Sequence, residues 1–496
     1  MWNDSSRWAW PSSDMHFTVI ARVLGIFLML FSLTMLPPMV VSMWYDDGAT
    51  EAFSVAMSLV LGIGFFSWLP FRGVKKELKT RDGFIVAALF WLTLGLAGTL
   101  PFMLAENPGL SFADAFFESL SGWTTTGATV MTGLEYLPKS ILWYRQQLQW
   151  LGGMGIIVLA VAILPMLGIG GMQLFRAEMP GPLKDSKLTP RITETAKALW
   201  YIYLSLTIAC ALAYWLAGMN TFDAIAHSFS TVGIGGFSTY DASMGHFDSA
   251  LIEAIAMFFM LVAALNFSLH FYAWRYKTVR HYFVDSEVKF FLFVMFGGAL
   301  LTVIALWMTD TYDFGGAVRY GLFELVSVAT TAGFGTADFS VWPVFLPVLL
   351  IMMAFIGGCA GSTGGGMKAI RILLVFKQGL REIHRLIHPN AIIPVKLGKQ
   401  PVADRILESV WGFFALYVVT FMVMMLALMA TGLDQVTAFS AVGSCLNNLG
   451  PGLGEVSAHY GNISDTAKWI LALTMLLGRL EIFTLLVLIT PSFWRS

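Results

Sequence analysis

One pattern recurs four times along this chain: a serine is followed six residues later by a glycine. The four pairs are Ser121/Gly127, Ser230/Gly236, Ser327/Gly333 and Ser444/Gly450. Each glycine belongs to a short run of small, hydroxylated or apolar residues, and each run lies between two long hydrophobic segments. Four such units can close around one axis. The repeat therefore predicts a fourfold arrangement around a central path.

These four runs have the chemistry of a filter for a dehydrated cation. Backbone carbonyls replace an ion's water shell only if the chain turns them inward, which requires the positive φ that glycine adopts without steric cost. No Asp, Glu, Lys or Arg lies within the runs, so carbonyl dipoles and hydroxyls supply the field, which suits a monovalent ion. The predicted filter residues are Thr125, Thr126, Gly127, Ile234, Gly235, Gly236, Thr331, Ala332, Gly333, Asn448, Leu449 and Gly450.

Composition sets the class of protein. The chain is 57% hydrophobic and 12% charged, against roughly 25% charged residues in a soluble domain. This predicts an all-α polytopic protein embedded in a lipid bilayer. The net charge of -1 gives no overall field that would favour a nucleic-acid partner. The three cysteines are far apart in apolar sequence and form neither a disulfide framework nor a metal-binding pattern.

Apolar runs long enough to cross ~30 Å of hydrocarbon occur ten times. The predicted spans are Phe17 to Trp44, Phe53 to Phe71, Gly83 to Leu104, Ile141 to Leu167, Ala198 to Met219, Ala250 to Tyr276, Val288 to Met308, Val341 to Val375, Ile406 to Ala430 and Ala467 to Ile489. They predict two leading helices and four helix–pore loop–helix repeats with pseudo-fourfold symmetry around one pore. The predicted boundaries are 1–82 for the leading helices, then 83–197, 198–287, 288–405 and 406–496 for the repeats.

The positions of Lys and Arg predict the orientation. The loops that connect the repeats carry nearly all of them, as in segment 72–82, whereas the filter-side loops are rich in carboxylates. Basic loops face the cytoplasm. The polar residues 1–16 have one basic residue, and no small-residue cleavage site follows the first apolar run, so we expect this run to be a retained anchor and not a cleaved signal peptide. We also expect both termini to be cytoplasmic and all four filters to face outward.

A short half-helix should precede each filter run. Ser111 to Asp114 and Thr431 to Asp434 have the spacing of a capping box, and Asp223 and Asp313 lie near the other two starts. A half-helix that enters from outside directs its carboxyl end, with about half a negative elementary charge, at the pore centre. Four such ends favour a cation there.

A stretch of ten residues without a large side chain interrupts the apolar span of the third repeat. Unpaired backbone at membrane depth is tolerated only beside protein or a water-filled cavity, so we expect this stretch to line the pore below the filter and act as a gate. Arg479 lies 11 residues after Lys468, roughly 16 Å deep at ~1.5 Å per residue, and should face the pore, because lipid exposure costs at least ~3 kcal/mol. The predicted gating residues are Gly357, Gly358, Cys359, Ala360, Gly361, Ser362, Thr363, Gly364, Gly365, Gly366 and Arg479.

Two other interpretations of this glycine-rich stretch are open to argument. The gap between Gly361 and Gly366 matches a phosphate-binding loop, but Met367 stands where that loop needs a lysine, so we reject nucleotide binding. Ser362 after Gly361 resembles the nucleophile of an intramembrane hydrolase, with His270 or His227 as base, although Ala360 replaces the first glycine of that motif. The hydrolase remains the alternative from another functional class.

Seven stretches together carry a specific resemblance. They are S-G-W-T-T-T-G-A-T-V from Ser121, R-Q-Q-L-Q-W-L-G-G-M-G-I from Arg145, N-F-S-L-H-F from Asn266, T-T-A-G-F-G-T-A-D-F from Thr330, G-G-C-A-G-S-T-G-G-G-M-K from Gly357, N-N-L-G-P-G from Asn447 and L-L-G-R-L-E-I from Leu476. In this order and spacing the chain resembles the membrane subunits of Trk-type bacterial potassium uptake systems, the TrkH family, within the Trk/Ktr/HKT superfamily of potassium transporters.

The resemblance implies a potassium transporter of the bacterial inner membrane rather than an enzyme. K⁺ would be the transported ion, held at the filter residues, and the chain would bind no organic cofactor. The resemblance also implies a homodimer with one pore per subunit and a cytosolic nucleotide-binding regulatory subunit of TrkA type. Glycine rather than serine at Gly127 goes with potassium preference in this superfamily. The second filter departs from the threonine-led pattern, because Ile234 and Gly235 precede Gly236. Coupling of potassium to sodium or protons, as in a symporter, remains the alternative within transport.

Overall fold

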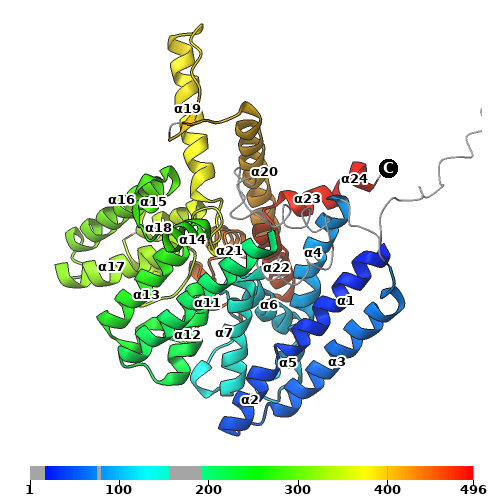
Figure 1. Ribbon diagram of the computed structural model, residues 1–496. Helices are drawn as coiled ribbons and strands as arrows, with labels where there is room; N and C mark the ends of the chain where they lie inside the picture. The colour runs from blue at the N-terminus through cyan, green and yellow to red at the C-terminus, as the bar shows by residue number, and fades with distance from the viewer. Residues whose placement is uncertain (1–16, 75–79, 156–191, 344, 399, 495–496) are drawn as a thin grey trace, which may run out of the picture.

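The computed structural model describes residues 17–74, 80–155, 192–343, 345–398 and 400–494 (Figure 1). Nearly all regular structure in these ranges is helical. The strands there are the two-residue pair β1 (Lys396–Leu397) and β2 (Gln400–Pro401), which are antiparallel. The prediction of an all-α fold is confirmed.

In the described part of the chain, three α-helices precede the repeats. They are α1 (Phe17–Leu33), α2 (Leu36–Tyr45) and α3 (Thr50–Trp68), followed by the short 3₁₀ helix η1 (Leu69–Phe71). α1 packs along α3 and against the first helix of the first repeat, with Phe27 and Phe53 in the shared core. These helices lie on one side of the bundle, in blue (Figure 1).

Four units follow, each with a first helix, a short pore helix and a second helix. The first helices are α4 (Thr80–Ala97, continued by α5, Leu100–Leu104), α11 (Ile192–Leu216), α16 (Ser286–Met308) and α20 (Asp404–Met429). The pore helices are α6 (Phe112–Trp123), α12 (Thr221–Gly233), α17 (Phe314–Ala329) and α21 (Gln435–Leu446). The second helices begin with α7 (Lys139–Gly153), α13 (Ala250–Ala263), α18 (Phe345–Ile356) and α22 (Asp465–Arg479). The returning segments contain the 3₁₀ helices η2 (Leu134–Tyr136), η4 (Ser243–Phe247), η5 (Phe339–Val341) and η6 (Gly454–Val456).

Each pore helix starts in the same way. A side-chain oxygen of the residue before the helix accepts a backbone N–H from its first turn, which satisfies donors that the helix cannot pair internally. The four capping residues are Ser111, Asn220, Asp313 and Asp434. The capping box expected at Thr431 is wrong. The Thr431 hydroxyl instead donates to the carbonyl of Leu428, and Asp434 itself caps α21.

In the second and fourth repeats the second helix is broken, which the sequence did not predict. α13 continues as α14 (Phe267–Tyr276) after a 94° bend, and α22 continues as α23 (Phe483–Ile489) after a 112° bend. Among the described residues, six helices are long and apolar enough to span a membrane, or eight if each bent pair counts as one span. The expected continuous helices over 250–276 and 467–489 are therefore wrong in detail, because each chain segment turns at its inner end.

Within the described residues, part of the third repeat extends well beyond the bundle. After α18 the chain passes through residues 357–368 and enters α19 (Ala369–Ile387), which projects beyond the body beside α20 (Figure 1). Short helices complete the described chain: α15 (Arg280–Val284) and α24 (Pro491–Trp494). Three parts of the chain lie outside the described residues: the polar residues 1–16, the basic residues Lys75, Lys76 and Lys79, and the end of the span predicted to finish at Leu167.

Candidate cation pathway between the four repeats

The four filter runs leave their pore helices through one shared hydrogen bond. In each repeat a backbone N–H bonds to the carbonyl oxygen of the serine five residues earlier, the same serine that defines the sequence repeat. The bonds run from Thr126 to Ser121, Gly235 to Ser230, Ala332 to Ser327 and Leu449 to Ser444, at 2.8, 2.9, 2.8 and 2.9 Å. The sequence repeat is thus a repeat of backbone geometry.

The backbone in each run alternates between left-handed and ordinary conformations. The four glycines have φ between +77° and +102°, as the sequence predicts. The residues two positions earlier, Thr125, Ile234, Thr331 and Asn448, are also left-handed, with φ between +53° and +68°. Because a non-glycine residue in this region costs roughly 1–2 kcal/mol, the surrounding structure must hold each run in place.

The four glycines close a ring in chain order. A Cβ atom on Gly127 would lie 2.0 Å from the Gly235 carbonyl oxygen, and one on Gly236 would lie 2.0 Å from that of Ala332. A Cβ on Gly333 would lie 2.1 Å from the Leu449 oxygen, and one on Gly450 would lie 2.7 Å from the Thr126 oxygen. Each repeat therefore abuts the next, and the fourth returns to the first. The twelve predicted filter residues are brought together around one axis.

A cavity of about 530 Å³ opens beside this ring, between the segments that follow the filter runs. All four filter glycines lie in its wall. The acidic and basic side chains in the wall are Arg145, Asp241, Glu324, Asp338 and His459. Arg145 and Glu324 are both buried and hydrogen-bonded within the protein, so the more exposed carboxylates of Asp241 and Asp338 give this entrance a negative character that favours cations.

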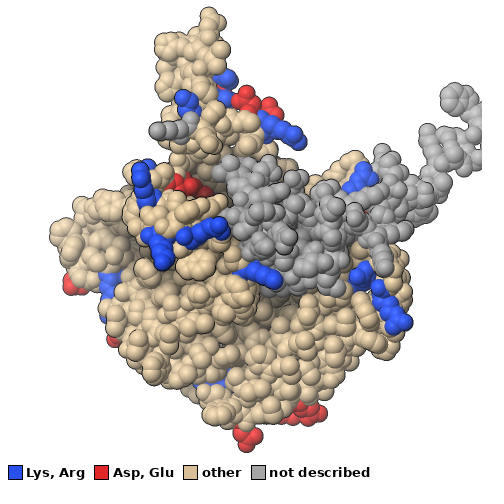
Figure 2. All heavy atoms as spheres, viewed as in Figure 1, with Lys and Arg blue, Asp and Glu red and all other residues tan. Residues whose placement is uncertain are grey.

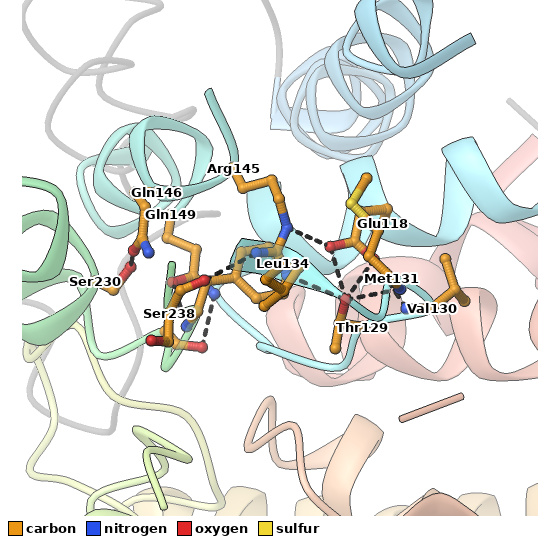
Figure 3. Close-up of polar contacts among 12 residues, drawn as sticks. Glu118, Thr129, Val130, Met131, Leu134, Arg145, Gln146, Gln149, Ser230 and Ser238 are labelled. Atoms are coloured by element: carbon orange, nitrogen blue, oxygen red, sulfur yellow. Dashed lines mark hydrogen bonds and ion pairs between the residues drawn. The ribbon is translucent and has the colours of Figure 1, made fainter. Parts of the chain in front are cut away.

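Arg145 joins the first two repeats (Figure 3). Its Nε donates to Glu118 of α6 at 2.7 Å, and its Nη1 donates to the carbonyl oxygen of Ser238 at 3.0 Å. The guanidinium also lies 4.2 Å from the ring centroid of Phe237. Glu118 accepts the backbone N–H of Val130 at 2.9 Å, on the segment that returns from the first filter. This buried ion pair fixes both filters to α7.

The other repeats hold their returning segments by comparable means. Glu324 accepts the N–H of Thr336 at 2.6 Å and that of Ala337 at 3.0 Å. His227 bonds the Ser238 hydroxyl at 2.9 Å, and Ser440 accepts the N–H of Leu453 at 2.7 Å. Each pore helix thus supplies a side chain that bonds the segment returning from its own filter run. These bonds restrain the filter backbone.

The glycine-rich stretch Gly357–Gly366 lies against the inner ends of the filters. Gly365 donates its N–H to the hydroxyl of Thr331 at 2.7 Å, and Gly366 donates to the carbonyl of Asn447 at 3.1 Å. The hydroxyl of Thr363 donates to the carbonyl of Val232 at 3.0 Å. The loop therefore contacts the carboxyl ends of three pore helices directly below the filter ring.

Two ionisable side chains that sequence analysis did not select hold this loop from its inner side. Glu287 accepts backbone N–H groups from Ala360 at 2.7 Å and Ile370 at 3.1 Å, so it links the loop to the start of α19. The Lys368 ammonium donates to the carbonyl of Gly364. Both residues are buried. A charged residue inside an apolar span is the signal that could have found Lys368, because such residues are expensive there unless they are paired.

Arg479 is placed at the same level, but not in the middle of a continuous span as expected. It is the last residue of α22, and the chain turns sharply after it, with left-handed Glu481 and Ile482. Its Nη2 donates to the carbonyl of Gly152 at 2.7 Å, and its Nη1 lies 3.4 Å from both the Thr125 hydroxyl and the Thr363 carbonyl. One guanidinium thus bridges the first filter, the loop and the end of α7.

The groups proposed for an intramembrane hydrolase do not meet. The Ser362 hydroxyl donates to the carbonyl of Cys359 at 2.6 Å. His270 bonds the carbonyl of Val262 and the hydroxyl of Tyr282, whereas His227 bonds Ser238 and the carbonyl of Asp223. Neither ring is placed to take a proton from Ser362.

Comparisons with known proteins agree with this architecture. A sequence profile of the TrkH family, described as cation transport protein, matches residues 50–496. The chain is 62% identical to the Trk system potassium uptake protein TrkH of Halomonas elongata and 56% identical to that of Escherichia coli K12, in each case over 97% of this chain and all of the relative. The crystal structure of the potassium transporter TrkH from Vibrio parahaemolyticus superposes with a TM-score of 0.89 at 56% identity, over 97% of this chain and all of that one. This multi-pass membrane chain belongs to the TrkH family of cation transport proteins.

Proposed function

We propose that this protein takes up potassium through the ring formed by the four filter runs. The observation that carries the proposal is the closure of Gly127, Gly236, Gly333 and Gly450 onto each other's neighbouring carbonyls in chain order. A ring of fixed carbonyl dipoles without formal charge binds a monovalent cation firmly enough to strip its water and weakly enough to release it. The names of the relatives indicate that the ion is potassium.

The loop Gly357–Gly366 and Arg479 form the gate of this pathway in our proposal. The loop occupies the space below the filter, where it bonds to Thr331 and Asn447. Arg479 holds the loop to the first repeat through Thr363 and Gly152. Conduction then requires the loop to leave these partners, and its glycines supply the backbone freedom for that movement.

The distribution of charge supports an orientation with the filters outward. Figure 2 shows most Lys and Arg in the half of the molecule from which α19 projects, together with some Asp and Glu, whereas the opposite edge shows mainly Asp and Glu. Basic loops remain on the cytoplasmic side. We propose that the protein resides in the bacterial inner membrane with both termini inside.

The assembly is also part of the proposal. The relatives are components of Trk systems by name. We propose a homodimer with one pathway per subunit, controlled by a cytosolic nucleotide-binding subunit of TrkA type. The far end of α19 supports this proposal, because its apolar side chains Leu386 and Ile387 are 84% and 65% exposed. They are therefore available for contact with a cytosolic subunit.

Purified protein in potassium-loaded liposomes tests the transport function. Rubidium uptake should follow the outward potassium gradient and ignore imposed sodium and proton gradients. Uptake that requires an inward sodium or proton gradient would instead establish a symporter. Absence of rubidium uptake above that of empty liposomes, with the regulatory subunit present, would refute the proposal.

A further inference from the structure

The second filter run differs from the other three in how it is held. Thr126 accepts a hydrogen bond from Asn448 at 3.0 Å, and Asn448 also donates to the carbonyl of Met475 at 3.1 Å. Thr331 accepts the N–H of Gly365 at 2.7 Å. These runs are tied by their own side chains. In the second run, Ile234, Gly235 and Gly236 carry no polar side chain at all.

Gln149 of α7 supplies the missing attachment. Its Nε2 donates to the carbonyl of Gly235 at 2.6 Å, and its Oε1 accepts the N–H of Phe237 at 3.0 Å. The side-chain amide therefore spans Gly236 and fixes the backbone on both sides of it. Gln149 is fully buried, so water cannot substitute for either bond.

The amide also occupies the volume that a side chain at position 235 would need. A Cβ on Gly235 would lie 2.3 Å from Cδ and 2.5 Å from Oε1 of Gln149. The first, third and fourth runs have Thr126, Ala332 and Leu449 at the equivalent position. Glycine at 235 and glutamine at 149 are thus complementary, since one leaves the space that the other fills.

Two neighbours on the same helix strengthen this attachment. Arg145 donates to the carbonyl of Ser238, and Gln146 accepts the hydroxyl of Ser230. Positions 145, 146 and 149 lie on one face of α7, and Figure 3 shows Gln146 directed at Ser230 and Arg145 between Glu118 and Ser238. One helix of the first repeat therefore positions the pore helix, the filter and the returning segment of the second.

We infer that Gln149 is a specificity-determining positioning residue of the filter, which holds the Gly235 carbonyl at the distance that distinguishes potassium from sodium. This inference rests on the proposed function. A carbonyl oxygen has two lone pairs, so Gly235 accepts the amide N–H with one and keeps the other for the ion. Without the clamp, two consecutive glycines gain conformational freedom, and the carbonyl can collapse onto a smaller cation.

Three variants of the full-length protein test it by potassium-to-sodium permeability in liposomes. Gln149→Leu removes both bonds at similar volume. Gln149→Glu keeps the acceptor for Phe237 but sets a carboxylate against the Gly235 oxygen. Gln147→Leu is the matched control, because Gln147 lies on the same helix, is 5% exposed and bonds Thr34 of the leading helices instead. Both Gln149 variants should lower the permeability ratio about five- to tenfold, the equivalent of one hydrogen bond, and the control should keep it.

A double substitution separates positioning from general destabilisation. Gly235→Ala alone should lower the stability of the folded protein, because its methyl group collides with the Gln149 side chain. Combined with Gln149→Ala, which vacates that space, Gly235→Ala should leave the stability close to that of Gln149→Ala alone. Permeability ratios of both Gln149 variants equal to that of Gln147→Leu would overturn the inference and leave the proposed function standing. A wild-type protein without potassium preference would overturn the filter assignment, and this inference with it.

Discussion

Gly333 and Leu449, from different repeats, lie so close that no side chain fits between them: a Cβ on Gly333 would be 2.1 Å from the Leu449 carbonyl oxygen. The same relationship holds at the three other junctions of the ring. Every junction joins a glycine to a carbonyl of the next repeat. A side chain added at one junction therefore cannot be accommodated without moving the neighbouring repeat.

Gly333→Ala should therefore destabilise the protein by about 3 kcal/mol, from a left-handed alanine and an overpacked contact together. Gly335→Ala is the matched control, because nothing lies within 4 Å of its Cβ position. The midpoint of thermal unfolding in detergent should fall for the first variant and stay within error for the second. Equal midpoints would show that the ring tolerates expansion.

The glycine-rich loop Gly357–Gly366, which we propose as the gate, lies against Asn447. A Cβ on Gly365 would lie 1.9 Å from the Asn447 carbonyl oxygen, so Gly365→Ala should push the loop off the filter and raise rubidium flux without the regulatory subunit. Deleting Gly364, Gly365 and Gly366 should do the same more strongly. The permeability ratio should not change, because the loop lies below the filter. Gly379→Ala in α19, with open space around it, serves as control. Unchanged flux in both folded loop variants would reject the gate.

Arg479 is expected to act in two ways: its charge repels the potassium ion, and its hydrogen bonds hold the glycine-rich loop. A fixed positive charge ~7 Å from an ion costs roughly 2 kcal/mol at an effective dielectric constant of ~20, a factor of about thirty in rate. Its bonds to Gly152 and Thr363 also hold the loop. Arg479→Ala should therefore raise rubidium flux into liposomes. It should also reduce the difference between the flux with the regulatory subunit and the flux without it.

Arg479→Lys tells the two effects apart. Lysine keeps the charge but cannot reach acceptors on separate segments with a planar fork. Because the guanidinium bridges Thr125, Thr363 and Gly152, we expect lysine to behave like alanine. A lysine variant with wild-type flux would assign the effect to charge, and a fall in flux for alanine in folded protein would contradict both accounts.

The buried pair of Arg145 and Glu118 should matter far more for stability than an exposed one. Arg145→Met leaves Glu118 buried and charged, which costs about 3–5 kcal/mol. Arg385→Met removes a pair with Glu382 in which both side chains are about half exposed, and exposed pairs contribute about 0–1 kcal/mol. Unfolding midpoints in detergent compare the two. Similar losses for both variants would argue against the role of Arg145 as a brace.

The spacing of serine and glycine was sufficient to predict the four units and the four runs that meet in one ring. The serine of each pair supplies the carbonyl that bonds the filter, and the glycine turns the chain, so both signals are local. The breaks after Ala263 and Arg479 were not predictable from hydrophobicity, because an apolar run has the same composition whether it is straight or bent.

Contacts between repeats could not be predicted from the sequence either. Gln149 was visible within the stretch that begins at Arg145, but its partner Gly235 lies 86 residues away. Glu287 meets Ala360 across a gap of 73 residues. A polar residue in an apolar helix signals that some partner exists, and only the packed structure identifies it.

The most direct test of the filter is the potassium-to-sodium permeability ratio of Gly127→Ser in liposomes. A serine there places a Cβ 2.0 Å from the Gly235 carbonyl oxygen in a left-handed conformation, so it must displace a filter ligand. Gly48→Ser is the control, since Gly48 has φ +80° with nothing within 4 Å of its Cβ position. We expect the wild type and Gly48→Ser to be equally selective for potassium. We expect the potassium-to-sodium permeability ratio of Gly127→Ser to be at least about tenfold lower, which corresponds to a loss of more than ~1.4 kcal/mol in discrimination. An unchanged ratio in folded Gly127→Ser would contradict it.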